Sequence, residues 1–221
     1  MTDPIRQLAR MDTSTVSDAL DRLGIAGQCL GIKPLSPDFR MFGPVFTLRY
    51  LPCGTRSGTV GDYIDDLPAG TIVALDNPGR LDATVWGDIL TTVANRNGLA
   101  GTLIDGVCRD APRSIELNYP IFARGNHMRT GKDRVMVDAV QCPIQIGGVR
   151  IEPGDYVLGD WDGVVAIAAS DLQRVAEAAC DIGAAEDRIR AAVLRGERLD
   201  QARRQHGYHR LQSLSQTGEP R

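Results

Sequence analysis

The sequence is poor in aromatic residues, which make up 5% of its 221 residues, while hydrophobic residues of all kinds make up 43%. We therefore expect a core built mainly from aliphatic side chains. It also lacks any apolar run near the ~18 residues that a membrane-spanning helix needs. The opening residues, MTDPIRQLARMD, lack the apolar centre of a signal peptide. We therefore expect a cytoplasmic protein that does not contact a membrane.

The chain carries no basic stripe, since its acids and bases are mixed along the sequence and its net charge is −3. This argues against a nucleic-acid partner. No two of the five cysteines form a CxxC pair, which favours reduced thiols over a disulfide framework or a zinc site. Most of these cysteines are expected to be buried and to pack like small hydrophobic residues. Cys108 stands beside an arginine, which favours a lowered pKa.

A strand–helix–strand pattern runs from residue 71 to residue 106. Residues 71–76 and 101–106 are buried-strand patterns, and 87–97 is an amphipathic helix that stops at Gly98. This succession predicts a βαβ unit and an α/β fold.

The rest of the chain predicts a mixed sheet and a long C-terminal helix. The second half is rich in turns that favour antiparallel strands. We expect one domain over residues 1–200 and a polar tail over 201–221. The expected helices are 14–24, 61–67 and, after a capping box at Ser170, about 170–195. The expected strands are 45–51, a Gly-Gly hairpin over 144–151, 156–160 and 164–168.

A glycine opens the predicted helix within the segment Val-Trp-Gly-Asp-Ile-Leu, residues 85–90. Such a start exposes backbone N–H groups, and the helix dipole adds partial positive charge, so a small carboxylate fits there. Asp88 suits the dipole as a first-turn acid and equally suits contact with a metal-bound water. An ordinary helix start, with Gly87 allowing close packing, explains the same pattern.

The segment Asp-Gly-Val-Cys-Arg-Asp, residues 105–110, follows a buried strand. Ligands gather at the carboxyl ends of strands in α/β sheets. Asp110 offers a hard oxygen ligand of the kind that Mg²⁺ or Mn²⁺ accepts. Arg109 offers a planar guanidinium for a carboxylate or keto oxygen. A structural ion pair at a helix start is the alternative that this dipeptide leaves open.

Several motifs occur in a fixed order along roughly residues 13–195, and together they resemble the RraA-like family, which includes 4-hydroxy-4-methyl-2-oxoglutarate aldolases. The resemblance is specific because several separate motifs occur in the same order as in the family. They are WGD (86–88), NGLAG (97–101), DGVCRD (105–110), PIFARG (120–125), GGV (147–149), PGD (153–155) and DWDGVV (160–165).

The resemblance implies a swivelling β/β/α fold and a homotrimer or homohexamer with active sites at subunit interfaces. It implies that Asp110 binds the metal and that Arg109 contacts the substrate's keto oxygen. Acids from a neighbouring subunit would complete the site, and the closest matches are Asp18 and Glu186. Asp88 would also touch metal-bound water. The backbone expected to hold the pyruvyl carboxylate is that of Gly87, Asp88, Ile89 and Leu90.

The resemblance therefore predicts a class II lyase dependent on Mg²⁺ or Mn²⁺. Its substrates would be small 2-oxo acids, cleaved as 4-hydroxy-4-methyl-2-oxoglutarate is, to give pyruvate. Oxaloacetate decarboxylation requires the same stabilisation of an enolate and is expected as well. The alternative is a protein-binding regulator that inhibits an endoribonuclease without catalysis.

Overall fold

The computed structural model describes residues 3–55, 57–208 and 211. It divides into two compact units. Residues Met1–Gly27 and Ser170–Arg221 form the helical unit, and Gln28–Ala169 forms the sheet unit. A single domain over residues 1–200 stays a prediction, and the boundary expected at residue 200 falls inside helix α6 (Leu199–Gln205).

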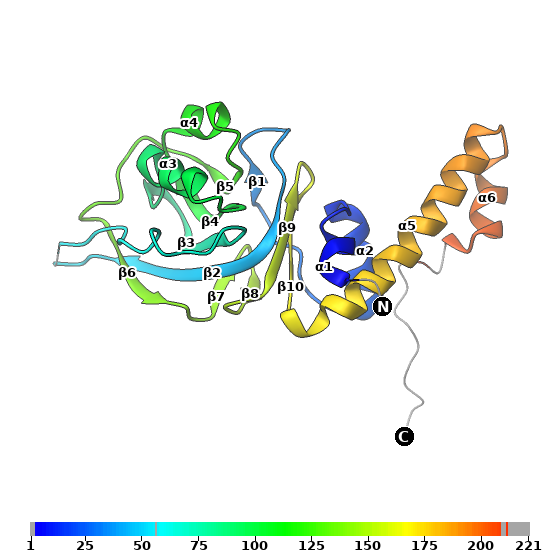
Figure 1. Ribbon diagram of the computed structural model, residues 1–221, viewed down its shortest axis with the longest axis horizontal. Coiled ribbons are helices and arrows are strands. Elements are labelled where there is room, and N and C mark those ends of the chain that lie inside the picture. The colour runs from blue at the N-terminus through cyan, green and yellow to red at the C-terminus, as the bar shows by residue number, and fades with distance from the viewer. Residues whose placement is uncertain (1–2, 56, 209–210, 212–221) are drawn as a thin grey trace, which may run out of the picture. The chain divides into compact units, whose positions relative to one another are not determined.

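The sheet unit is built on the mixed sheet that the sequence predicts (Figure 1). Its strands lie in the order β1-β5-β4-β3-β2-β9-β10, and β6 also pairs with β2. Strands β2, β3, β4 and β5 are parallel, and the remaining pairings are antiparallel. The strands are β1 (Lys33–Pro34), β2 (Met41–Pro52), β3 (Ile72–Thr84), β4 (Gly101–Cys108), β5 (Ile121–Asn126), β6 (Val135–Val140), β9 (Tyr156–Asp160) and β10 (Gly163–Ile167).

The predicted βαβ unit is confirmed, because β3 and β4 pair in parallel and α3 (Asp88–Arg96) joins them. Gly98 follows α3 with a φ of 69°, in the left-handed region where glycine ends a helix without strain. The strand expected at 45–51 is also present but longer, as β2. Its first part pairs with β9 and its last part with β6, so it extends past the expected bounds at both ends.

Two hydrophobic clusters cover the two faces of the sheet. Because side chains alternate along a strand, Ile72 and Ala74 face one cluster while Val73 and Leu75 face the other. The hairpin of β7 (Ile144–Ile146) and β8 (Val149–Ile151) packs on the first face. Helices α3 and α4 (Ala111–Glu116) lie on the opposite side in Figure 1. Strands β7 and β8 pair antiparallel, so the predicted Gly-Gly hairpin is confirmed.

The helical unit contains α1 (Pro4–Leu8), α2 (Thr13–Leu23), α5 (Leu172–Leu194) and α6. In α2 the Asp12 carboxylate accepts the Thr15 N–H at 2.7 Å, and Gly24 ends the helix at a φ of 68°. The capping box expected at Ser170 does not form. A 3₁₀ turn, Ala169–Asp171, precedes α5 instead. In the described part of the chain, no helix combines the length and apolarity needed to cross a bilayer.

The helix expected over residues 61–67 is wrong, because this segment is a loop with one turn between Ile64 and Leu67. Gly61 has a φ of 86°, which a right-handed helix does not accommodate. Pro68 follows Leu67 and disfavours helical backbone at the residue before it. The loop instead places Ile64 in the hydrophobic cluster on the α3 side of the sheet.

Candidate functional site

The start of α3 forms one side of the site. Gly87 is its N-cap residue, with an extended backbone and no side chain to bond the first N–H groups. The Asp88 carboxylate accepts the N–H of Ile89 at 2.8 Å. These amides lie at the positive end of the helix, where an acidic group or ligand is favoured.

The end of β4 forms the other side. Asp110 adopts a left-handed conformation, with a φ of 57°, and begins α4. The Arg109 N–H donates to the Trp86 carbonyl oxygen at 2.9 Å, so this backbone hydrogen bond ties the two segments together. Asp88 N–H donates to Asp110 Oδ2 at 3.4 Å. Asp88 and Asp110 are 22 positions apart in the sequence, and they lie together because the parallel strands β3 and β4 precede them.

Arg109 and Asp110 also contact each other, with 3.2 Å between Nε and Oδ2. Their side chains are 39% and 41% exposed, so a surface ion pair of this kind adds little to stability. The ion pair left open by the sequence is therefore present. It stands at a strand end beside a helix N-terminus, with both side chains accessible to a ligand.

Gly87 is the point where these groups converge. A Cβ placed on it would lie 2.9 Å from Asp110 Oδ2, 3.2 Å from Arg109 Nε and 3.3 Å from Arg109 Cγ. The φ and ψ of Gly87 are −152° and −167°, which any residue can adopt. The glycine is consequently required for space and not for backbone conformation.

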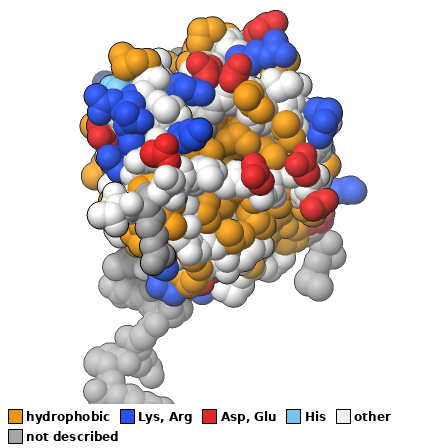
Figure 2. Space-filling model, turned by 90° about the vertical axis from the view of Figure 1, so that its left-hand side faces the viewer, with side chains coloured by type: hydrophobic (Ala, Val, Ile, Leu, Met, Phe, Trp, Pro, Cys, Tyr) orange, Lys and Arg blue, Asp and Glu red, His pale blue; other side chains and the backbone are white. Residues whose placement is uncertain are grey.

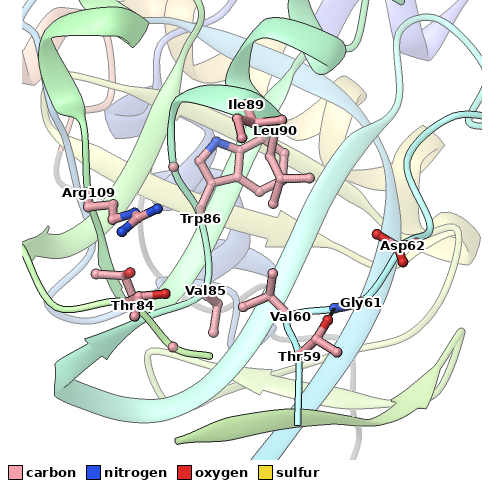
Figure 3. A pocket seen from close by; sticks show the side chains of 13 residues that line it. Thr59, Val60, Gly61, Asp62, Thr84, Val85, Trp86, Ile89, Leu90 and Arg109 are labelled. Carbon is pink, nitrogen blue, oxygen red and sulfur yellow. Dashed lines mark hydrogen bonds between the residues drawn. The ribbon is translucent and has the colours of Figure 1, made fainter. Parts of the chain in front are cut away.

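A pocket of about 230 Å³ opens beside these residues (Figure 3). It is smaller than the roughly 300–1,000 Å³ typical of pockets for drug-sized ligands, so it suits a ligand smaller than a drug molecule. Figure 3 shows Arg109 on one side of the pocket, Asp62 on the opposite side, and Trp86 with Ile89 and Leu90 above. On the face of the molecule seen in Figure 2, hydrophobic side chains occupy the middle, with charged side chains around them.

Sequence reasoning missed most of the far wall of this pocket. It comes from the loop after β2, from the end of β3 and from the segment after β5. A Cβ on Gly131 would collide with the Thr84 carbonyl oxygen, so the glycine itself is the mark that this close approach leaves in the sequence. The residues missed are Thr59, Val60, Gly61, Asp62, Thr84, Thr130 and Gly131.

The predicted acids Asp18 and Glu186 lie in the helical unit, on α2 and α5. Burial raises the pKa of Glu186 above its ordinary value, and the nearby negative charge of Asp18 raises it further. The two acids are thus neighbours of each other. Six of the predicted site residues lie in the sheet unit: Gly87, Asp88, Ile89, Leu90, Arg109 and Asp110.

Metal binding would rest on Asp110. Among the residues that the structure describes, no group of three His, Cys, Asp or Glu side chains could hold an ion by itself. Mg²⁺ usually keeps several waters and needs only one or two protein carboxylates. The accessible Asp110 carboxylate fits that requirement. Cys108 does not compete for the ion, because burial raises its thiol pKa to about 12, contrary to the lowering expected from its neighbour.

Comparison with known proteins gives three relevant matches. Protein DlpA of Legionella pneumophila is 41% identical over 211 residues, which cover 94% of this chain but 34% of DlpA. The chain thus spans about a third of that relative. A Halalkalibacterium halodurans protein named "Putative 4-hydroxy-4-methyl-2-oxoglutarate aldolase" is 33% identical over 177 residues, 80% of this chain and 82% of that protein.

A solved structure of Streptomyces coelicolor RraAS2 has a similar fold, with a TM-score of 0.78 at 29% identity. The match covers 83% of this chain and 94% of that one, which is described as an unusual member of the RNase ES inhibitor RraA protein family. A family model described as "RraA-like: Aldolase/RraA" matches residues 13–166, which include the α3 start and the Arg109–Asp110 pair. The chain belongs to the RraA-like family.

Proposed function

We propose that the protein is a lyase, dependent on Mg²⁺ or Mn²⁺, that cleaves 4-hydroxy-2-oxo acids of the 4-hydroxy-4-methyl-2-oxoglutarate type to pyruvate. We also expect it to decarboxylate oxaloacetate. The supporting observation is the convergence at Gly87, where the space a Cβ would fill is bounded by Asp110 Oδ2 and Arg109 Nε. The aldolase name of the Halalkalibacterium relative supports the same class of reaction.

In this proposal the N-terminus of α3 binds the substrate's carboxylate. The N–H groups of Asp88, Ile89 and Leu90 lie in the first turn, where the helix dipole favours an anion. The Asp88 and Ile89 N–H groups donate to the carboxylates of Asp110 and Asp88, and the substrate carboxylate would replace these acceptors. Arg109 places positive charge beside the 2-oxo oxygen, where negative charge develops as the carbon–carbon bond breaks. Asp110 holds the divalent ion, which when bound supplies Lewis-acid polarisation of the 2-oxo group.

Cleavage requires a base as well. A base removes the proton of the 4-hydroxyl group, the bond between C3 and C4 breaks, and its electron pair forms the enolate of pyruvate, which is then protonated at C3. In this proposal the base is a water molecule, and Asp88 orients it. Glu186 and Asp18 would assist from a neighbouring subunit of a homotrimer or homohexamer, and light scattering of the purified protein tests that assembly.

The test is pyruvate release from oxaloacetate and from 4-hydroxy-4-methyl-2-oxoglutarate in the presence of Mg²⁺. Free Mg²⁺ slowly decarboxylates oxaloacetate, so the rate without protein is subtracted. We expect turnover with both substrates, its loss in excess EDTA, and its loss in Asp110→Ala. Turnover that persists in Asp110→Ala would contradict the metal-dependent mechanism.

A second candidate function is supported by the similarity to the Streptomyces RraAS2 structure. In that case the protein would bind and inhibit an endoribonuclease and would not catalyse a reaction. Pull-down with a purified endoribonuclease, followed by an RNA cleavage assay, distinguishes the two. Inhibition by Asp110→Ala equal to that by the wild type, together with no lyase turnover, would favour the regulator.

A further inference from the structure

A buried chain of hydrogen bonds lies behind the α3 N-terminus. The Trp86 indole N–H donates to Thr91 Oγ1 at 2.9 Å, and the Thr91 hydroxyl donates to the Gly87 carbonyl oxygen, also at 2.9 Å. The Thr91 backbone N–H donates to the same carbonyl oxygen at 3.0 Å. Trp86 is 2% exposed and Thr91 is 1% exposed, so water does not compete for these bonds.

Holding the Gly87 carbonyl oxygen also fixes the next amide. Gly87 C=O and Asp88 N–H belong to one planar peptide unit and point in opposite directions. Two bonds from Thr91 direct the oxygen into the helix, and the N–H consequently points outward, where it lies 3.4 Å from Asp110 Oδ2. The Thr91 hydroxyl thus acts on the first amide of the proposed carboxylate site without lying in the pocket.

The same hydroxyl holds the pocket wall. The Trp86 ring lines the pocket and stacks on Tyr119, with an interplanar angle of 5° and centroids 6.3 Å apart. Tyr119 is itself bonded to Thr102 through a 2.9 Å contact between hydroxyl oxygens. The indole is therefore held on its face by Tyr119 and at its N–H by Thr91. The Trp86 carbonyl oxygen meanwhile accepts the Arg109 N–H.

We propose that Thr91 is a positioning residue for the carboxylate site at the α3 N-terminus. Its hydroxyl accepts from Trp86 and donates to Gly87, and so sets both the pocket wall and the direction of the Asp88 N–H. The inference rests on the proposed function, in that the ligand is the carboxylate of a 2-oxo acid. Thr91 contacts neither substrate nor metal and acts through the groups that do.

Thr92 provides a matched control in the same helix turn. Its hydroxyl donates to the Asp88 carbonyl oxygen at 2.8 Å, the same contact with the residue four positions earlier, but it is exposed. The Trp86 N–H bonds to Thr91 and not to Thr92. The Asp88 carbonyl belongs to the peptide that carries the Ile89 N–H, but water can replace the hydroxyl of an exposed residue as its partner. Thr92→Val therefore removes a hydroxyl that bonds to the helix backbone without breaking the buried chain that reaches the pocket.

The test compares Thr91→Val, Thr91→Ser and Thr92→Val with the wild type. Oxalate, in the presence of Mg²⁺, is the binding probe. Binding is followed by Trp86 fluorescence in a Trp161→Phe background, since Trp161 is the other tryptophan and is 58% exposed. KM and kcat are measured with oxaloacetate, and the melting temperature Tm is measured for each variant. Thr91→Ala, with a stronger helix former, repeats the loss of the hydroxyl if Thr91→Val does not fold.

We expect Thr91→Val to weaken oxalate binding and to raise KM about tenfold, with kcat changed by less than about threefold. A carboxylate site contributes equally to substrate and transition state, so its damage raises KM. Thr91→Ser should restore both values to within about threefold, and Thr92→Val should match the wild type. A purely structural role for Thr91 would lower Tm and kcat and leave KM unchanged.

Unchanged KM and oxalate affinity in Thr91→Val, or equal changes in Thr92→Val, would overturn the inference. An absence of wild-type turnover with normal oxalate binding would overturn the proposed reaction alone. The oxalate affinities of the variants would then still decide the role of Thr91. An absence of oxalate binding in the wild type would overturn the inference.

Discussion

Replacing Gly87 with alanine should disturb the candidate site while leaving the fold intact. The new Cβ would lie 2.9 Å from Asp110 Oδ2, a distance that real Cβ contacts essentially never show, and 3.2 Å from Arg109 Nε. Asp110 Oδ2 is the end of a side chain that is 41% exposed, and Arg109 Nε belongs to a flexible side chain that is 39% exposed, so both can yield by a few tenths of an ångström. The backbone of Gly87 accommodates alanine without strain.

The stability cost should be small. Alanine is a poorer N-cap than glycine by about 1 kcal/mol or less. Loss of glycine's freedom in the unfolded chain returns roughly 0.4–1 kcal/mol. The net change is therefore within about 1 kcal/mol, or a Tm shift of roughly 2–4 °C for a chain of this size.

The effect on catalysis should be larger. Misplacement of a ligand-holding group by about 1 Å costs roughly 100-fold in rate. The displacement here is a few tenths of an ångström, so we expect Gly87→Ala to lower kcat/KM for oxaloacetate about tenfold, which corresponds to about 1.4 kcal/mol. The assay follows pyruvate release by coupling it to NADH oxidation with lactate dehydrogenase.

Gly183→Ala is the matched control. Gly183 lies inside α5, and a Cβ there would stand in ordinary van der Waals contact with Thr15 Cγ2, at 3.8 Å. We expect unchanged kcat/KM and stability higher by up to about 1 kcal/mol, since glycine weakens a helix interior. Wild-type kcat/KM in Gly87→Ala would refute the placement of the reaction beside Gly87. A fall in Tm above about 10 °C would refute the argument that the neighbouring side chains yield.

Further substitutions test the separate roles. Asp110→Asn should abolish Mn²⁺ binding measured by calorimetry, whereas Arg109→Lys should retain it and lower kcat/KM by roughly 100-fold or more, because lysine lacks the planar fork. Asp62→Lys should raise kcat/KM for 4-hydroxy-2-oxoglutarate relative to 4-hydroxy-2-oxopentanoate by roughly fivefold, because the wall facing Arg109 then attracts a second carboxylate. Glu186→Gln should raise Tm at pH 7 and lose that gain as pH falls below 4.5, the ordinary pKa of the group. The pKa of Glu186 is raised in the folded chain, so its ionisation destabilises the fold at neutral pH. Equal Tm differences at both pH values would contradict that reasoning.

Local pattern was sufficient for the elements that carry the site. The apolar runs before Asp76 and Asp105 predict β3 and β4, and the period of the helix between them predicts α3. Parallel strands joined by a helix bring their carboxyl ends to the same edge of the sheet, which explains why Gly87 and Arg109 lie together. The left-handed φ of Gly98 agrees with its predicted place as a helix stop.

Local pattern failed where contacts distant in sequence decide the backbone. Residues 61–67 have helix-compatible composition, but Ile64 is buried in the sheet cluster and Gly61 adopts a positive φ. The capping box at Ser170 failed similarly, since the chain first makes a 3₁₀ turn after β10. In both cases the way the segment connects to the sheet outweighs its local propensity.

The sequence by itself determined the α/β class, the βαβ unit and the pair Arg109–Asp110 at a strand end, because hydrophobic periodicity and strand order depend on nearby residues. The tertiary structure decided what surrounds that pair. It placed the wall containing Asp62 opposite Arg109 and the buried Thr91 behind Gly87. Side-chain distances of this kind depend on how loops and helices pack across the sheet, and no short-range periodicity encodes them.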